Sequence, residues 1–225
     1  MTKYFELVKE KILKQLRSKE YIEAYQGTEQ FKVDKNHSLQ VVELITRLWK
    51  KDFHEEPPEA LCIAGLVHDS DRYYPQREVN TKNVPPSLYE YRKGIHSGNT
   101  ALIFFEHNYH DLPLELLRDV CFLVLRHERG GDVDKEGVLF EKKDEYTFTF
   151  NLNLLANYLY YADKLSFFYS NIFLYKERGA ERLVKKIAYS ITELPPHILD
   201  EIRAIPYDDP TIKEALQKVL SQVKQ

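Results

Sequence analysis

Apolar residues recur every three or four positions along most of the chain, and this spacing predicts a bundle of α-helices. One run, Ala60 to Val67, is apolar or small at every position, so we expect it to form a buried, central helix. Only 8 glycines occur in 225 residues, which disfavours folds built from many tight turns. The sequence therefore predicts an all-α fold.

The pattern also predicts where the helices lie. We expect helices over about 2–25, from a cap at Asp34 or Asn36 through Phe53, from Pro57-Pro58 to His68, and over about 94–109, 113–128 and 150–178. Two or three short helices follow, separated by Pro195-Pro196 and Asp208-Asp209-Pro210. Residues 70–93 read as a loop long enough to be functional, and residues 145–150 as a short strand or the lead-in to the next helix. We expect a single domain, 1–225, with a core of about 30–178 and terminal helices 1–29 and 179–225 packed on it.

Charge and cysteine content limit the classes of protein. A formal net charge of −3 argues against a surface built for nucleic acid, and no stretch reaches transmembrane length. Cys62 and Cys121 each lie in an apolar run, which is typical of buried thiols in a reducing compartment. We therefore expect a cytoplasmic protein that binds neither nucleic acid nor membrane.

Several polar residues fall on the apolar stripes, where burial is expected. One lies a turn before Val41, another follows Val124, and a third follows Leu159, all at helical spacing. A His-Asp pair ends the apolar run at 60–67. The residues concerned are His37, His68, Asp69, His127 and Asp163.

A buried carboxylate or imidazole is costly unless it has a partner. A single histidine in such a place is more often a hydrogen-bonded core residue than a metal ligand. Four helices that each place a histidine or aspartate on the core stripe favour a shared partner instead. A divalent cation neutralises the carboxylates and accepts the imidazole lone pairs together, so the pattern predicts a metal site.

The remaining histidines need separate interpretations. His96 lies on a helix whose apolar stripe is ambiguous, so burial does not support it. His110-Asp111 is a second His-Asp pair, but it follows a helix end and is expected in an exposed turn. His54, His107 and His197 are expected at the surface or at helix ends, with His107 retaining a small claim because it shares a face with His96.

The order His37, His68-Asp69, His96, His127, Asp163 resembles the HD superfamily of metal-dependent phosphohydrolases, which are all-α bundles with the pattern H…HD…D. The two extra histidines, His96 and His127, resemble the subset that holds two metals. By this likeness Asp69 bridges the ions, with His37, His68 and Asp163 on one metal and His96 and His127 on the other. The resemblance covers residues 37–163.

Within the superfamily, the chain is similar in look to bacterial enzymes that cleave diadenosine tetraphosphate symmetrically. The stretches that carry this likeness are HDSDR (68–72), IHSGNTA (95–101), LRHERGG (125–131) and YADKLSFF (161–168). Arg72 replaces the lysine usual in that group, and the 70–93 loop does not match it. Fold and metal site are thus implied more firmly than substrate.

The implied chemistry is hydrolysis of a phosphoester or phosphoanhydride bond of a nucleotide-type substrate by a metal-activated water. Mixed imidazole and carboxylate ligands favour iron or manganese, with cobalt, nickel and zinc as alternatives. Asp69 and Asp71 are the candidate catalytic residues, and Asp71 either orients the water or caps the following loop. The candidate phosphate-binding residues, for each of which a solvated surface cation is an equal alternative, are Arg72, Arg126, Arg129 and Lys164.

Other functions stay open. A single-metal 5′-nucleotidase, another nucleotide phosphodiesterase or a ppGpp hydrolase would use similar ligands, and a non-catalytic regulatory module could retain the pocket. Only Tyr-Tyr-Pro occurs at 73–75 where cyclic-dinucleotide enzymes of the HD-GYP type carry Gly-Tyr-Pro. The extra terminal helices are compatible with a homo-oligomer.

Overall fold

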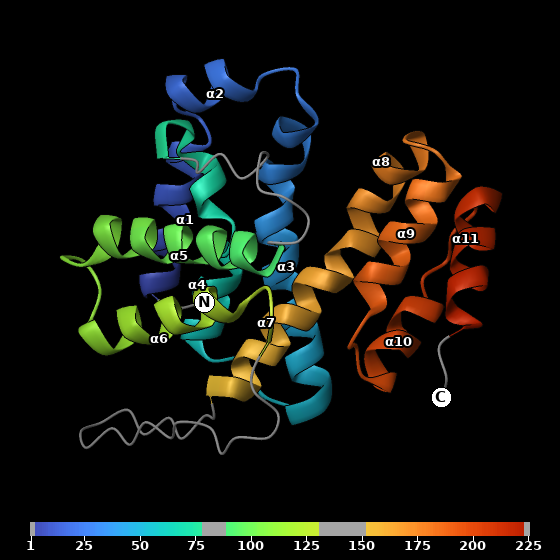
Figure 1. Ribbon diagram of the computed structural model, residues 1–225. Coiled ribbons are helices and arrows are strands. Elements are labelled where there is room, and N and C mark those ends of the chain that lie inside the picture. The colour runs from blue at the N-terminus through green and yellow to red at the C-terminus, as the bar shows by residue number, and fades with distance from the viewer. Residues whose placement is uncertain (1–2, 78–88, 131–151, 223–225) are drawn as a thin grey trace. The chain divides into compact units, whose positions relative to one another are not determined.

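The computed structural model describes residues 3–77, 89–130 and 152–222, and within them every regular element is helical (Figure 1). The predicted all-α fold is confirmed. The described residues form two compact units, Met1–Tyr160 and Tyr161–Gln225, and the division falls inside one helix, α7 (Leu152–Ser166). The expectation of a single domain stays a prediction. The segment 145–150, read as a strand or a lead-in, lies outside the described residues.

The first unit contains most of the helices. Its elements are α1 (Lys3–Gln15), α2 (Lys19–Tyr25), α3 (Glu29–Phe53), α4 (Glu59–Val67), the 3₁₀ turns η1 (Ser70–Tyr73) and η2 (Pro75–Arg77), α5 (Tyr89–Asn108), α6 (Leu114–Arg126) and the start of α7.

Helix α4 forms the centre of this unit, as the apolar run predicts. Its residues Leu61–Val67 are all buried, and it contacts α1, α3 and α6. Gly65 permits the close approach of α3, because a Cβ at this position would lie 2.6 Å from Cδ1 of Ile45. The C-terminal end of α4, which carries His68-Asp69, is thereby held against the face of α3 that carries His37.

The expected helix boundaries near the N-terminus were wrong in two places. The helix predicted over 2–25 is interrupted, because the Ser18 side chain accepts a hydrogen bond from the Tyr21 amide and starts α2. Helix α3 begins at Glu29 with Thr28 as its N-cap, earlier than Asp34 or Asn36. Asp34 does not cap a helix; it is buried and accepts a 2.9 Å hydrogen bond from the Tyr21 hydroxyl.

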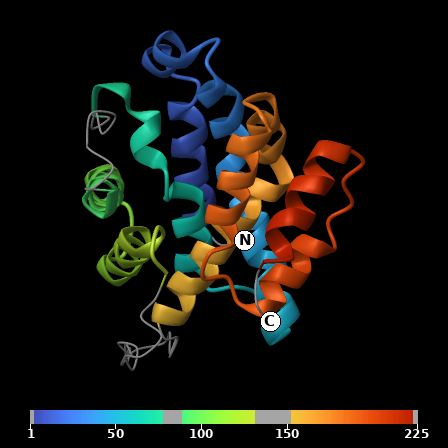
Figure 2. The ribbon, with the colours of Figure 1, turned by 45° about the vertical axis from the view of Figure 1, so that its right-hand side comes forward.

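Helices α5 and α6 lie side by side, as two views from different directions show (Figure 1, Figure 2). Helix α5 begins at Tyr89, so the end of the segment predicted as a loop, residues 89–93, is helical. Helix α6 ends close to its predicted end. Gly130, at φ 71°, donates its amide to the Arg126 carbonyl over 2.8 Å, a conformation that suits glycine.

The second unit contains the rest of α7, the π-helical turn η4 (Phe167–Asn171), α8 (Ile172–Glu177), α9 (Ala180–Ile191), α10 (Pro196–Arg203) and α11 (Pro210–Leu220). The long helix predicted over 150–178 thus changes hydrogen-bond pattern at η4, where the Phe168 carbonyl accepts the Tyr207 hydroxyl over 2.5 Å.

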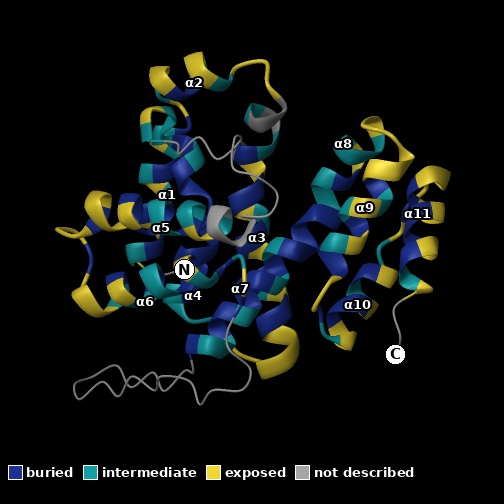
Figure 3. Cartoon of the chain, in the orientation of Figure 1, coloured by how far each residue is buried: buried dark blue, intermediate teal, exposed yellow. Residues whose placement is uncertain are grey.

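The three short C-terminal helices match the prediction, including the prolines that separate them. Each is amphipathic: in α9 the buried side is marked by Leu183, Ile187 and Ile191, and Figure 3 shows α9 and α11 buried on one side and exposed on the other. Among the described helices, none combines the length and the apolar character needed to cross a membrane.

Candidate metal centre

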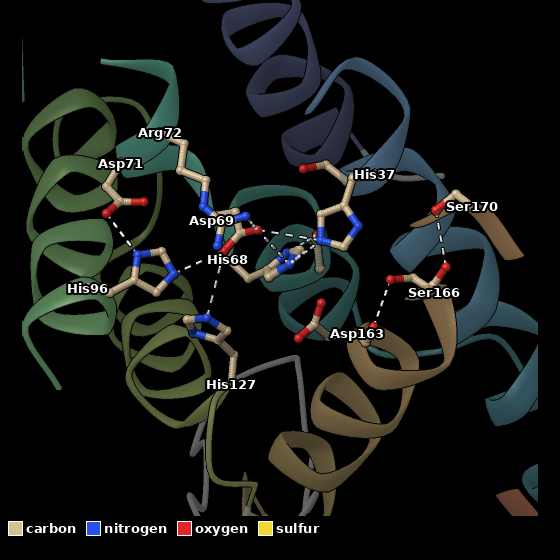
Figure 4. A network of polar contacts seen from close by, with 12 residues as sticks. His37, His68, Asp69, Asp71, Arg72, His96, His127, Asp163, Ser166 and Ser170 are labelled. Carbon is tan, nitrogen blue, oxygen red and sulfur yellow. Dashed lines mark hydrogen bonds and ion pairs between the residues drawn. The ribbon is translucent and has the colours of Figure 1, made fainter. Parts of the chain in front are cut away.

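Polar residues from five elements meet at the buried end of α4 (Figure 4). They fall into two groups, and in each group every residue offers one ligand atom within 4.8 Å of the others. The first group consists of His37, His68 and Asp163, and the second of Asp69, His96 and His127. These are the six residues that the sequence predicts as metal ligands; Asp163 lies on α7 and is half-buried.

The carboxylate of Asp69 faces both groups, one oxygen to each. Its Oδ2 lies 3.4 Å from Nε2 of His37 and 3.6 Å from Nε2 of His68. Its Oδ1 lies 3.0 Å from Nε2 of His96 and 3.9 Å from Nε2 of His127. A single carboxylate at this position can therefore ligate two ions.

Two of the histidines occupy helix ends, and the ends determine how their rings are held. His68 follows the last residue of α4, and His127 follows the last residue of α6. The Nδ1 atom of His68 lies 2.9 Å from the Gly65 carbonyl, and that of His127 lies 2.6 Å from the Val124 carbonyl. Because a carbonyl only accepts, each Nδ1 carries the proton and each Nε2 presents its lone pair to the site.

The Nε2 atoms of His37 and His68 approach each other to 3.0 Å. Only one nitrogen of such a pair can carry a proton in a hydrogen bond, and His68 already carries its proton on Nδ1. In the absence of a cation His37 is therefore the donor. A bound cation would instead accept a lone pair from each nitrogen, since both belong to one group of potential ligand atoms.

His96 lies inside α5, with 14% of its side chain exposed. Its Nδ1 lies 2.8 Å from Oδ2 of Asp71, so the ring stands between two carboxylates, those of Asp71 and Asp69. Burial lowers the pKa of the His96 ring, but the hydrogen bonds to Asp69 and Asp71 outweigh it and raise the pKa to about 10. The two carboxylates that raise this pKa would equally favour a cation bound beside the ring.

The donor set fits a transition-metal ion. Nε2 of His127 is buried and has no hydrogen-bond partner among the residues that the structure describes, which is costly for a polar atom unless a ligand meets it. Burial raises the pKa of the Asp69 carboxyl, but Arg72 and the histidines outweigh it and hold that pKa well below its usual range. Burial lowers the pKa of His127. An ionised carboxylate and neutral imidazoles are the forms that bind such ions.

Of the predicted phosphate-binding residues, Arg72 lies at the site. Its guanidinium forms an ion pair with Oδ2 of Asp69, and 37% of its side chain is exposed. Arg126 donates from Nε to the Gly130 carbonyl over 3.0 Å, and Arg129 is exposed. Lys164 is buried, with Nζ 3.7 Å from the centroid of the Tyr189 ring in the second unit. The role of Arg126, Arg129 and Lys164 in binding phosphate stays a prediction.

The other histidines lie outside the two groups. His110-Asp111 is in the turn after α5, exposed, with Asp111 2.6 Å from Nζ of Lys11. The ring of His107 stacks on Tyr74 at 4.7 Å. His54 ends α3 in a left-handed conformation, and His197 is exposed in α10.

Sequence reasoning missed a buried polar network next to the site. The Ser38 and Tyr73 hydroxyls lie 2.5 Å apart, and both residues are buried. Ser38 follows His37 and Tyr73 follows Arg72, so the contact joins α3 to η1 at residues adjacent in sequence to two site residues. The spacing of Asp34 and Ser38, one turn apart, was the available signal, because both lie beside the stripe that includes His37 and Val41.

Comparison with known proteins agrees with this geometry. The model of the HD domain family matches residues 35–167, more than half of the chain, and the match includes all six residues of the two groups. No curated protein and no solved structure matches the chain. With its helical fold, its paired histidine groups and this match, the chain belongs to the HD domain family.

Proposed function

We propose that this protein is a metal-dependent hydrolase that cleaves a phosphoester or phosphoanhydride bond of a nucleotide-type substrate, using two divalent transition-metal ions. The observation that carries the proposal is the position of Asp69, whose two carboxylate oxygens face two separate histidine groups. One ion would be held by His37, His68, Asp69 and Asp163, and the other by Asp69, His96 and His127. HD domains are generally metal-dependent hydrolases, which supports the same reaction class.

Such ions lower the pKa of a bound water towards neutrality and offset negative charge on phosphate oxygens. The protein's own contribution is positional. Asp69 is held ionised in a buried place, and backbone carbonyls fix the rings of His68 and His127 with Nε2 towards the site. Arg72, half-exposed beside Asp69, would donate hydrogen bonds to a phosphate oxygen at the ions.

For the substrate we propose a dinucleoside polyphosphate such as diadenosine tetraphosphate, and for the metal iron or manganese. The support for the substrate is the likeness of HDSDR (68–72), LRHERGG (125–131) and YADKLSFF (161–168) to enzymes of that specificity. The support for the metal is the mixture of imidazole and carboxylate ligands, which suits these ions better than magnesium or calcium.

The test is a turnover assay on the full chain, stripped of metal by a chelator and reconstituted separately with Fe²⁺, Mn²⁺, Co²⁺ or Ni²⁺. The substrates are diadenosine tetraphosphate, deoxynucleoside monophosphates, ppGpp and cyclic dinucleotides. We expect metal-dependent release of ADP from diadenosine tetraphosphate, and none from Asp69→Asn. Absence of turnover of every compound with each metal restored would overturn the enzymatic function.

A further inference from the structure

The site histidines are oriented in two different ways. His68 and His127 stand at the ends of helices, where the last four carbonyls have no partner within the helix. Each ring holds its Nδ1 proton against a carbonyl of this last turn, that of Gly65 or that of Val124; the Val124 carbonyl also accepts the His127 amide. The orientation of these two rings therefore follows from the backbone alone.

His96 has no such carbonyl available. It lies in the interior of α5 (Tyr89–Asn108), where the carbonyls of the preceding turn accept the helix's own amide hydrogen bonds. Its Nδ1 instead meets a side chain from another element, the carboxylate of Asp71 on η1, at 2.8 Å. An ionised carboxylate only accepts hydrogen bonds, so it selects the form of His96 that carries a proton on Nδ1.

Burial of the Asp71 carboxylate is energetically unfavourable unless the carboxylate serves to orient the His96 ring. The residue is 4% exposed, and its Oδ1 is buried without a hydrogen-bond partner among the described residues. Among the described residues, its carboxylate forms one ion pair, with His96. Removing a carboxylate from water costs free energy that a single ion pair seldom restores. The position of Asp71 therefore favours a functional over a structural role.

We propose that Asp71 is a positioning residue that orients His96 so that Nε2 ligates the ion shared by Asp69, His96 and His127. This inference rests on the proposed function and gives Asp71 a different task from direct contact with the attacking water. Of the two histidines that would hold this ion, His127 is oriented by a backbone carbonyl and His96 by one carboxylate. Loss of the carboxylate from a carboxylate–histidine–metal arrangement commonly lowers metal affinity about 10–100-fold.

The inference predicts a selective defect in Asp71→Asn. An amide can donate to Nδ1 as well as accept from it, so His96 can then carry its proton on Nε2, where it blocks ligation. The ion at Asp69, His96 and His127 should be weakened about 10–100-fold. The ion at His37, His68 and Asp163 should keep its affinity, because Asp71 contacts none of these three side chains.

The experiment is a titration of metal-stripped full-length protein with Mn²⁺, with bound metal counted by mass spectrometry after equilibrium dialysis. The control is Asp111→Asn, which makes the same chemical change in the other, exposed His-Asp pair. The wild type and the control should bind two ions per chain, and Asp71→Asn should bind one at wild-type affinity and the second more weakly. Asp71→Ser replaces Asp71→Asn if that variant lacks the helical circular dichroism of the wild type.

A second measurement tests whether Asp71 acts through His96. In a double-mutant cycle, Asp71→Asn should have no further effect on metal binding once His96→Ala is present. With Zn²⁺ bound, ¹⁵N shifts of the His96 ring should report a proton on Nδ1 in the wild type and its loss or exchange in Asp71→Asn.

The outcomes separate the two proposals. If the wild type binds no ion, the proposed function fails and this inference fails with it. If the wild type binds two ions and folded Asp71→Asn binds both as tightly, or loses both equally, the positioning role alone is overturned.

Discussion

The chain contains two His-Asp pairs with different surroundings. His68-Asp69 follows the buried helix α4, and its residues are 0% and 4% exposed. His110-Asp111 follows α5 in an exposed turn, where Asp111 pairs with Lys11. The same dipeptide thus lies in the candidate metal centre in one place and on the surface in the other. The residues that precede the pair, rather than the pair itself, determine which role it has.

The largest expected difference concerns the aspartates. Asp69→Asn removes a charge that faces both histidine groups, and we expect turnover to fall by about 10⁴-fold or more, the loss typical for one member of a catalytic unit. Asp111→Asn should leave turnover unchanged. Steady-state rates of both variants at saturating Mn²⁺ check this, and equal losses in the two would remove the contrast.

The next difference concerns the apolar residues before each pair. Leu66, 1% exposed, packs in the core, and Leu66→Ala should lower the free energy of unfolding by about 2–5 kcal/mol. Tyr109, 50% exposed, precedes the surface His-Asp pair, and Tyr109→Ala should change the free energy of unfolding by less than about 0.5 kcal/mol. Urea denaturation followed by circular dichroism measures both; similar losses would mean that burial does not distinguish the two places.

A smaller effect is expected from the buried hydrogen bond between Ser38 and Tyr73. Tyr73→Phe leaves the buried hydroxyl of Ser38 without the partner 2.5 Å away, which should cost about 1–3 kcal/mol in the free energy of unfolding. Metal stoichiometry should not change, because neither hydroxyl belongs to the two ligand groups. Loss of an ion in this variant would show that the network is part of the metal centre.

The smallest effect is expected at the surface pair. Lys11 holds the pKa of the Asp111 carboxyl below its usual range, so the ion pair stabilises the fold above the unfolded-state pKa and this contribution is lost as pH falls through the folded-state pKa. Lys11→Met should therefore lower Tm slightly at neutral pH, and the part due to Asp111 should vanish in acid. Thermal unfolding at neutral and acidic pH checks the sign; a difference that grows in acid would contradict it.

Periodicity was sufficient to predict the residues that line the core. Val41, Ile45 and Leu48 are buried as expected, and the positions that continue such stripes, His37 and His127, reach the site. His96 could be proposed only from its order in the chain, because its contacts come from η1 and the other group members rather than from an apolar stripe.

The features that escaped prediction depend on contacts between distant segments. The start of α3 was misplaced because Asp34 looks like a cap in sequence, whereas it pairs with Tyr21 from another helix. The partner of Asp71 was equally hidden, since His96 lies 25 positions away. Local spacing indicates which face of a helix is buried, but not which polar residue of another element meets it.

The most direct test of the metal centre is a crystal structure of the Mn²⁺-loaded protein with anomalous diffraction data. We predict two anomalous peaks, one bound by Oδ2 of Asp69 with His37, His68 and Asp163, and the other by Oδ1 of Asp69 with His96 and His127. Mn²⁺ peaks only at other places, or a single ion that Asp69 does not ligate, would contradict the assignment.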